Sequence, residues 1–169
     1  MAGGVSVRLA AEAVLEIAET AAGLKGRVVA GEAALDSCCE DNGWALVVAT
    51  EGFLPVAGFP TPWAQERGGS GAVACPPDLG VVMHVLLARC VPTINDDGTP
   101  PDPRVEREVH LDLLDKTEAV WRSLSRQTPL MIVGESSRFT VQGGCGWIDI
   151  PVTVDPDEFC PPIPVLSGD

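Results

Sequence analysis

The most uniformly apolar stretch of the chain is LGVVMHVLLARCVPT, residues 79–93. Apolar side chains occupy both parities of this segment, whereas a strand with one solvated face alternates apolar with polar positions. The pattern therefore favours a central strand that is covered on both faces. A buried helix is the alternative, but the Val-rich composition and the flanking prolines favour the strand. The stretch is too short to span a bilayer as a helix, which needs ~20 apolar residues.

Two amphipathic helices are predicted from apolar residues at 3–4 spacing. The first covers residues 6–23, with Ser6 as its N-terminal cap and Gly23 as a stop signal. The second covers residues 103–127, where Asp102 is the cap and Pro103 occupies the first position, at which a missing N–H is tolerated. The apolar stripes consist of Ala10, Val14, Ile17, Ala21 and Leu24 in the first helix, and of Val105, Val109, Leu113, Val120 and Leu124 in the second, widened by Leu114 and Trp121.

Shorter strands are predicted on both sides of the central one. Residues 26–35 begin as a strand, and Asn42-Gly43 indicates a tight turn before a strand at 44–50, so these two segments are expected to form a hairpin. Residues 130–135 form another strand, and 136–146 can add a short one. Residues 147–155 alternate, with four β-branched residues facing inward, and Pro151 indicates that this half-exposed strand lies at a sheet edge.

Together these elements predict an α+β domain, residues 1–155, with a mixed or antiparallel sheet of four to five strands and both helices on one face. A long Gly/Pro-rich loop at 51–78 is inserted in it, and an extended Pro-rich tail, residues 156–169, follows. The loop or another subunit is expected to cover the second face of the sheet. Phe53, Phe59 and Trp63 are apolar anchors in the loop, which suits either an arm on a neighbouring surface or a flap folded back on its own domain.

The composition and charge of the chain argue against several classes of function. The net charge of −13, from 24 acidic and 11 basic residues, argues against a positive footprint for nucleic acid. The apolar fraction of 46% is that of a folded globular protein. The N-terminus lacks the charged opening and the apolar core of a signal peptide, so we expect a protein made and kept in the cytoplasm, without membrane association.

The sequence offers little catalytic chemistry. No hydrolase, zinc-protease or nucleotide-binding fingerprint is present, so we expect no enzyme activity and no catalytic, cofactor-binding or metal-binding residues. The six cysteines form no CxxC pair and are far from His84 and His110 in sequence, which argues against a local zinc site. His84 is expected in the core and His110 on the surface of the second helix. A Cys-dependent enzyme, with His110 as a base for Cys145, is a distant alternative.

Free buried thiols are the expected state of the cysteines in a cytoplasmic protein. A disulfide is the alternative, since Cys38 or Cys39 could approach Cys75, Cys90 or Cys145 in space. Vicinal cysteines rarely act as a redox pair, so a redox protein that uses the first two is disfavoured.

A particular order of Cys-bearing motifs runs through the chain. DSCC (36–39) precedes WALVV (44–48), Cys75 ends the Gly/Pro loop, LLARCVPT (86–93) ends the central strand, and GGCGW (143–147) begins the alternating strand. The joint occurrence of DSC, ARC and GGC at this spacing, with DDGTPPDP (96–103) before an acidic helix, resembles the tail terminators of long-tailed actinobacterial phages. The resemblance covers about residues 6–154.

This resemblance implies a structural virion protein of the siphovirus neck, assembled in the host cytoplasm. Tail terminators are α+β proteins that form a hexameric ring on the head-proximal end of the tail tube. The ring ends tube polymerisation and docks to the head-closure (stopper) protein, while DNA passes through the lumen without specific binding. A stopper or another head-tail connector ring protein is the nearer alternative.

The resemblance carries no catalytic residues. It implies that Cys38, Cys90 and Cys145 are structural, and Cys75 is a further structural candidate. The candidates for contacts with other subunits or partners are four aromatic residues: Phe53, Phe59, Trp63 and Trp147. Negative charge facing the lumen would repel DNA phosphates and keep DNA from adhering.

Overall fold

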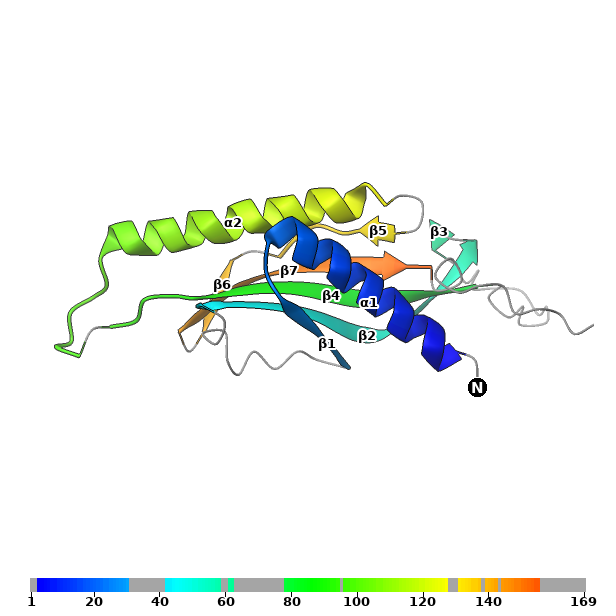
Figure 1. Cartoon of the computed structure of the whole chain (residues 1–169), viewed down its shortest axis with the longest axis horizontal. Helices are drawn as coiled ribbons and strands as arrows, with labels where there is room; N and C mark the ends of the chain where they lie inside the picture. Colours follow the sequence, from blue (N-terminus) through cyan, green and yellow to red (C-terminus); the bar gives the residue numbers. More distant parts are fainter. Residues whose placement is uncertain are drawn as a thin grey trace, which may run out of the picture.

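The computed structural model describes residues 3–30, 42–58, 61–62, 78–94, 96–127, 131–137, 139–142 and 144–155. Within them, helices α1 (Gly3–Ala22) and α2 (Pro103–Ser125) lie on the same face of a mixed sheet (Figure 1). Five strands follow the order β1-β2-β4-β7-β5, while β3 pairs with β2 and β6 with β7. The strands are β1 (Gly26–Ala30), β2 (Trp44–Gly58), β3 (Thr61–Pro62), β4 (Asp78–Cys90), β5 (Met131–Val133), β6 (Thr140–Gln142) and β7 (Cys145–Val154). The predicted α+β class, with two helices on one face, is confirmed.

Strand β4 is the centre of the sheet, because it pairs antiparallel with β2 on one side and with β7 on the other. Its odd-numbered side chains are buried under the helices and form the middle of the core: Val81, Met83, Val85 and Leu87. On the opposite face Val82, His84 and Leu86 are half-buried, and Ala88 is buried. The prediction that β4 is covered on both faces is therefore confirmed for the face under the helices. It is only partly correct for the opposite face.

Helix α1 packs on the sheet through a stripe of small residues. Ala10, Ala11, Val14, Ala18 and Ala22 are buried, so the predicted Ala10 and Val14 are confirmed. The other predicted members, Ile17, Ala21 and Leu24, are only partly buried and pack against the core. The predicted cap was wrong, because a serine caps a helix only where the preceding backbone is not yet helical, and α1 already begins at Gly3. The predicted stop is confirmed: Gly23 has a positive φ of 65°, and its N–H donates to the carbonyl of Glu19.

Helix α2 begins as its sequence predicts. The Asp102 side chain accepts a hydrogen bond from the N–H of Arg104, and proline follows the cap. The buried stripe consists of Val109, Leu113, Thr117, Val120 and Leu124. The first predicted member of the stripe, Val105, is 44% exposed instead, because the start of α2 extends past the end of β4 (Figure 1). Neither helix of the described part combines the length and the apolarity that a bilayer crossing requires.

The predicted hairpin of residues 26–35 with 44–50 is wrong. β1 and β2 are parallel, in register from Gly26↔Leu46 to Ala30↔Thr50. The turn at Asn42-Gly43 does form, with φ values of 54° and 80°, and the Gly43 carbonyl accepts a hydrogen bond from the N–H of Cys90. The turn was therefore predicted correctly, but it does not join β2 to β1 as a hairpin, since a turn motif does not specify which neighbour the next strand pairs with.

The predicted loop 51–78 is shorter than expected, because β2 continues through it to Gly58. A β-bulge between Thr50 and Gly52 absorbs Glu51, and the ladder to β4 then resumes. β1 ends opposite Thr50, so Pro55 lies where β2 has only one partner strand, a position that tolerates a missing N–H. Residues 63–77 and the predicted tail, 156–169, lie outside the described residues.

Strand β7 was predicted at an edge and lies inside the sheet, between β4 and the short strands β5 and β6. The carbonyl of Pro151 accepts a hydrogen bond from the N–H of Gly134 at 2.8 Å. Since the N–H and C=O of one strand residue point to the same side, the N–H that proline lacks would point away from β4. Pro151 therefore leaves the β4–β7 ladder intact. The inward alternation is confirmed, with Ile148, Ile150, Val152 and Val154 all buried.

Candidate docking surface

The sheet face opposite the two helices carries a polar bridge across three strands. His84 of β4 lies between Asp149 of β7 and Glu51 of β2. Its Nδ1 is 2.7 Å from Asp149 Oδ2, and its Nε2 is 2.6 Å from Glu51 Oε2. Glu51 is the extra residue of the β2 bulge. The bulge therefore supplies one of the two carboxylates of the bridge.

The electrostatics of the bridge favour a protonated histidine. Burial alone would lower the pKa of His84, but the hydrogen bonds and charges of Asp149 and Glu51 outweigh it and raise that pKa above 6.5. An imidazolium donates from both ring nitrogens, one to each carboxylate, whereas a neutral imidazole donates from only one. The side chains are 28% exposed for His84, 26% for Asp149 and 65% for Glu51, so the inner contact is the more shielded from water.

Asp149, whose carboxylate forms the inner contact of the bridge, is held in place by backbone hydrogen bonds with Ser137. The N–H of Asp149 donates to Ser137 Oγ at 2.9 Å, and the N–H of Ser137 donates to the Asp149 carbonyl at 2.7 Å. The segment after β5 therefore fixes the position of β7 at this residue, and with it the direction from which the carboxylate meets His84.

A disulfide lies at one end of the same face. Cys90 of β4 and Cys145 of β7 are both disulfide-bonded and are direct cross-strand partners, so we assign them to each other. The N–H of Cys90 donates to the carbonyl of Gly43 at 2.8 Å, on the β2 side. The Cys pair is thus a non-hydrogen-bonded site, where Cα atoms are ~4.5 Å apart, within the range that a disulfide spans.

This bond corrects two sequence-based expectations. Free thiols were expected as the usual state, which is wrong for Cys90 and Cys145. The enzyme alternative used Cys145 with His110 as a base, but a disulfide sulfur is not the thiolate that attacks a substrate. The His110 ring instead stacks on Phe139, with centroids 4.4 Å apart and an interplanar angle of 19°.

The structure separates the predicted contact residues. Trp147 is half-buried and packs, with Ala45, against buried Ala88 and Cys145 beside the disulfide. Phe53 pairs with Val81 in the register, near the other end of β4, and is 60% exposed. The remaining predicted residues lie outside the described part of the chain: Phe59, Trp63, Cys38 and Cys75.

A second charged cluster, on the helix face, joins both helices to the strand ends. The Arg89 guanidinium lies 4.8 Å from the ring centroid of Trp44, and Lys116 Nζ lies 5.3 Å from it. Arg89 also forms an ion pair with Asp112 of α2. Lys116 of α2 donates to the carbonyl of Ala22, the last residue of α1, at 2.5 Å. A cation at a helix C-terminus is favourable, so this cluster fixes α1 against α2.

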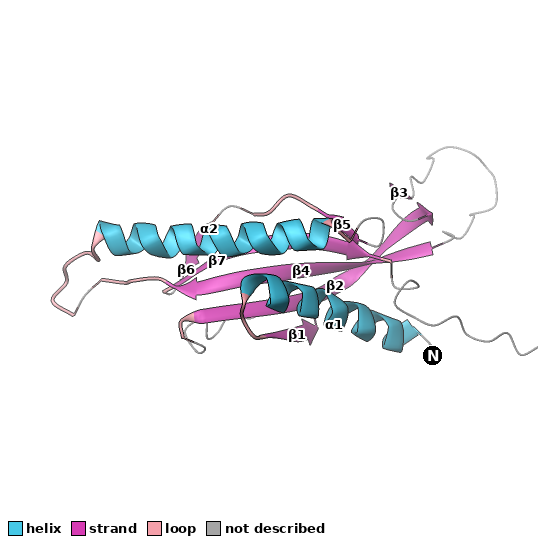
Figure 2. Cartoon of the chain, turned by 45° about the horizontal axis from the view of Figure 1, so that its top comes forward, coloured by secondary structure: helices cyan, strands magenta, loops and turns pink. Residues whose placement is uncertain are grey.

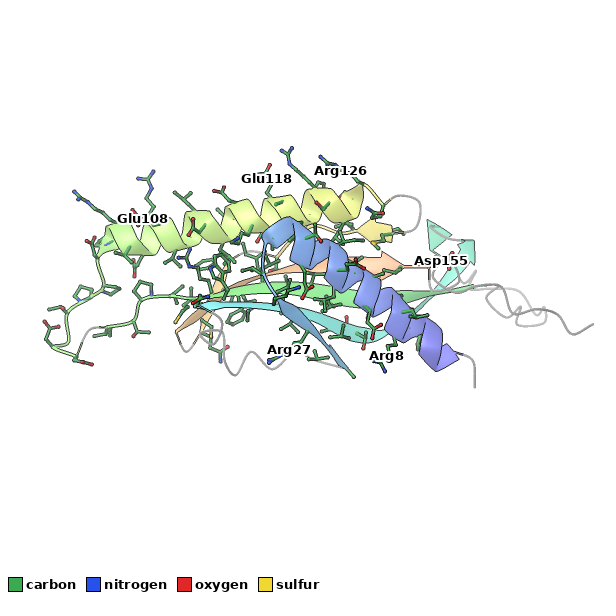
Figure 3. All side chains as sticks on the ribbon, in the orientation of Figure 1. Arg8, Arg27, Glu108, Glu118, Arg126 and Asp155 are labelled. Carbon is green, nitrogen blue, oxygen red and sulfur yellow. The ribbon has the colours of Figure 1, made fainter. Side chains whose placement is uncertain are left out.

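Two ends of the molecule project beyond the body formed by α2 and the sheet (Figures 1 and 2). The end of β2 and the start of β4 extend past the end of α2, while the connection from β4 to α2 extends past the start of α2. Near the two ends of β4, Phe53 lies opposite Val81 and Ile94 follows the strand. With 60% and 70% exposure, they are the most exposed of the large apolar side chains in the described ranges. Between the ends, Glu118 and Arg126 extend outward from α2 (Figure 3).

Sequence reasoning missed the bridge. Glu51 was placed in a loop, His84 in the core, and Asp149 was predicted to face outward without a partner. The available signal was a histidine in an otherwise apolar strand, which requires polar partners when it is partly buried. No three His, Cys, Asp or Glu side chains of the residues described above form a group that could hold a metal ion.

The chain matches no protein-family model. No curated protein matches it either.

Proposed function

We propose that this chain is a structural virion protein of the phage neck, a tail terminator that forms a ring on the head-proximal end of the tail tube. The order of Cys-bearing motifs supports the proposal. The structural observation that carries it is a pair of exposed apolar residues, Phe53 and Ile94, near opposite ends of β4.

Two different exposed apolar residues, far apart on one subunit, suit a heterologous contact, in which one surface of a copy packs on a different surface of the next. Such contacts close into a ring when the rotation between copies is a whole fraction of a turn. Burying a side chain such as Phe53 contributes ~1.5–3 kcal/mol per contact, and a ring multiplies that contribution around its circumference.

The charge of the chain is consistent with a lumen for DNA. With a net charge of −13, a wall that presents carboxylates repels the phosphates and lets the duplex pass without adhering. The tail tube protein and the head-closure protein are the proposed partners on the two sides of the ring.

The test is the mass of the purified full-length protein by light scattering, alone and with tail tube protein, followed by negative-stain imaging. A hexamer of 17.7 kDa subunits has a mass of roughly 106 kDa. Phe53→Ser is expected to weaken assembly without unfolding the subunit, whereas Ile132→Ser, which alters a 36%-exposed residue of β5, serves as the matched control. A monomer that never assembles, even with tube protein, would refute the proposal.

A second measurement separates the terminator from the nearer alternative, a stopper or other connector ring. A terminator added to polymerising tail tube protein ends elongation, so tube length in the electron microscope falls as its concentration rises. A ring that leaves tube length unchanged but binds head-closure protein would favour the alternative.

A further inference from the structure

A pocket of about 450 Å³ opens where α2 begins. Its apolar lining includes Pro92 after β4, Pro103 at the first position of α2, and Val141 of β6. The stacked rings of His110 and Phe139 form one wall. The pocket is therefore built from prolines and flat rings, contributed by three segments that are far apart in the sequence.

This lining indicates the chemistry of the ligand. Grooves lined by aromatic rings bind Pro-rich segments in the polyproline II conformation, which is formed in advance and loses little entropy on binding. The rim carries both signs of charge, because Glu106 and Arg107 line the pocket, and the helix N-terminus adds a partial positive charge. A Pro-rich peptide fits the apolar lining, and an acidic residue beside the prolines can pair with Arg107 or with the helix N-terminus.

The chain itself contains such a peptide. Residues 156–169 read PDEFCPPIPVLSGD, in which Asp157 and Glu158 precede the run CPPIPVL. The segment follows β7 directly, at the end of the sheet away from the pocket. Gly146, near the start of β7, lies beside the pocket, since a methyl group on it would be 2.5 Å from the Phe139 ring.

We propose that residues 156–169 of one copy dock into the His110–Phe139 pocket of a neighbouring copy. The proposal rests on the self-assembly proposed above and names one of its contacts. Length favours a neighbour over the same chain. From Gly146 to Val154 the strand spans ~27 Å, and in polyproline II the run from Pro161 to Pro164 lies ~19–28 Å beyond Asp155. The run would reach its own pocket only if it doubled straight back, with no residues left for a turn.

The experiment uses full-length variants that each remove one side of the contact. Val141→Glu places a charge at the pocket on a residue that is 54% exposed, so the fold is retained. Gln142→Glu on the same strand is the matched control. Ile163→Glu alters the tail, with Ser167→Glu as its control. Each site variant is expected to assemble only at ~tenfold or higher protein concentration, the equivalent of losing one buried aliphatic contact, while both controls assemble as wild type.

Mixing distinguishes the neighbour from the same chain. When the Val141→Glu and Ile163→Glu proteins are combined, the intact tail of the first meets the intact pocket of the second, so light scattering should detect larger species than either variant forms alone. A synthetic peptide of residues 156–169 should also bind the Ile163→Glu protein. Adding Val141→Glu to that protein should weaken binding ~tenfold or more, and a peptide with the Ile163→Glu change should bind equally poorly.

The outcomes separate this inference from the proposed function. If wild type forms rings and both site variants form them equally well, the docking proposal is overturned and the ring stands. If the peptide binds in a Val141-dependent way but mixing restores nothing, the tail docks in its own chain, which overturns the proposal. If wild type never assembles, the ring proposal fails, and the absence of peptide binding would then overturn the docking as well.

Discussion

Replacing His84 by glutamine removes the positive charge that joins β2, β4 and β7. A hydrogen bond to a charged group contributes ~1.5–3 kcal/mol when it is well buried, and exposed ion pairs contribute ~0–1 kcal/mol. The Asp149 contact lies between these limits, because both side chains are about one quarter exposed, while the 65%-exposed Glu51 adds little. Allowing for solvent screening, we expect His84→Gln to lower the free energy of unfolding by ~1–2 kcal/mol, or the Tm by ~2–8 °C.

The sign of the pH dependence follows from the raised pKa of His84. The folded state holds this proton more tightly than the unfolded chain, so the bridge contributes fully below pH 6.5 and its contribution is lost as the pH rises through the folded pKa. The stability gap between wild type and His84→Gln is therefore expected to be widest at about pH 5.5 and to narrow towards pH 9.

Urea unfolding followed by tryptophan fluorescence at pH 5.5, 7 and 9 measures this gap. Glu51→Gln is the matched control, since it removes the outer carboxylate and leaves the Asp149 contact in place. It is expected to cost less than ~1 kcal/mol. A His84→Gln gap of the same size at pH 5.5 and pH 9 would refute the reasoning, because it would show that the charge on the imidazole does not stabilise the fold.

Three further predictions concern stability. Cys90→Ser opens a loop of roughly 55 residues and is expected to cost up to ~4 kcal/mol; identical urea curves for wild type with and without reductant would contradict this. Gly26→Ala brings a Cβ to 2.8 Å from the Leu46 carbonyl oxygen and should cost ~1–3 kcal/mol, so an unchanged Tm would contradict the close approach. Lys116→Met loses the hydrogen bond to Ala22 and should lower stability by ~1 kcal/mol in thermal unfolding, where equal Tm values would show that the cluster does not hold α1.

The sequence correctly predicted the features that depend only on residues close together in the chain. The cap chemistry of Asp102 and Pro103 placed the start of α2, because both residues act on the N–H groups of the next turn. The uniform apolarity of 79–93 identified β4. The alternation from Ile148 to Val154 identified which side of β7 is buried, since side-chain direction in a strand has a period of two.

The predictions were wrong where the structural role of a residue depends on a strand that is distant in the sequence. Pro55 and Pro151 were read as a loop residue and an edge marker. Each is tolerated because the adjacent strand on one side is absent or interrupted there, which is a property of the sheet and not of the local sequence. The parallel pairing of β1 with β2 was missed for the same reason.

The candidate site was the least predictable part. The three residues of the bridge come from three strands, and one of them owes its position to a bulge. Likewise the pairing of Cys90 with Cys145 depends on the register of β4 against β7, which the spacing of cysteines along the chain does not encode.

The parallel attachment of β1 implies that the molecule does not open as a single cooperative unit. Strands β2, β4 and β7 pair as antiparallel neighbours, and the disulfide joins two of them. Residues 3–30 are attached by a five-residue ladder at the sheet margin and by a helix whose buried stripe is mostly alanine. Such a stripe exposes little apolar area when the helix detaches. Amide hydrogens in α1 and β1 should therefore exchange through a sub-global opening, below the free energy of complete unfolding. While α1 and β1 are detached, the edge of β2 that paired with β1 exposes its backbone N–H and C=O groups. A strand from another chain can then pair with this edge.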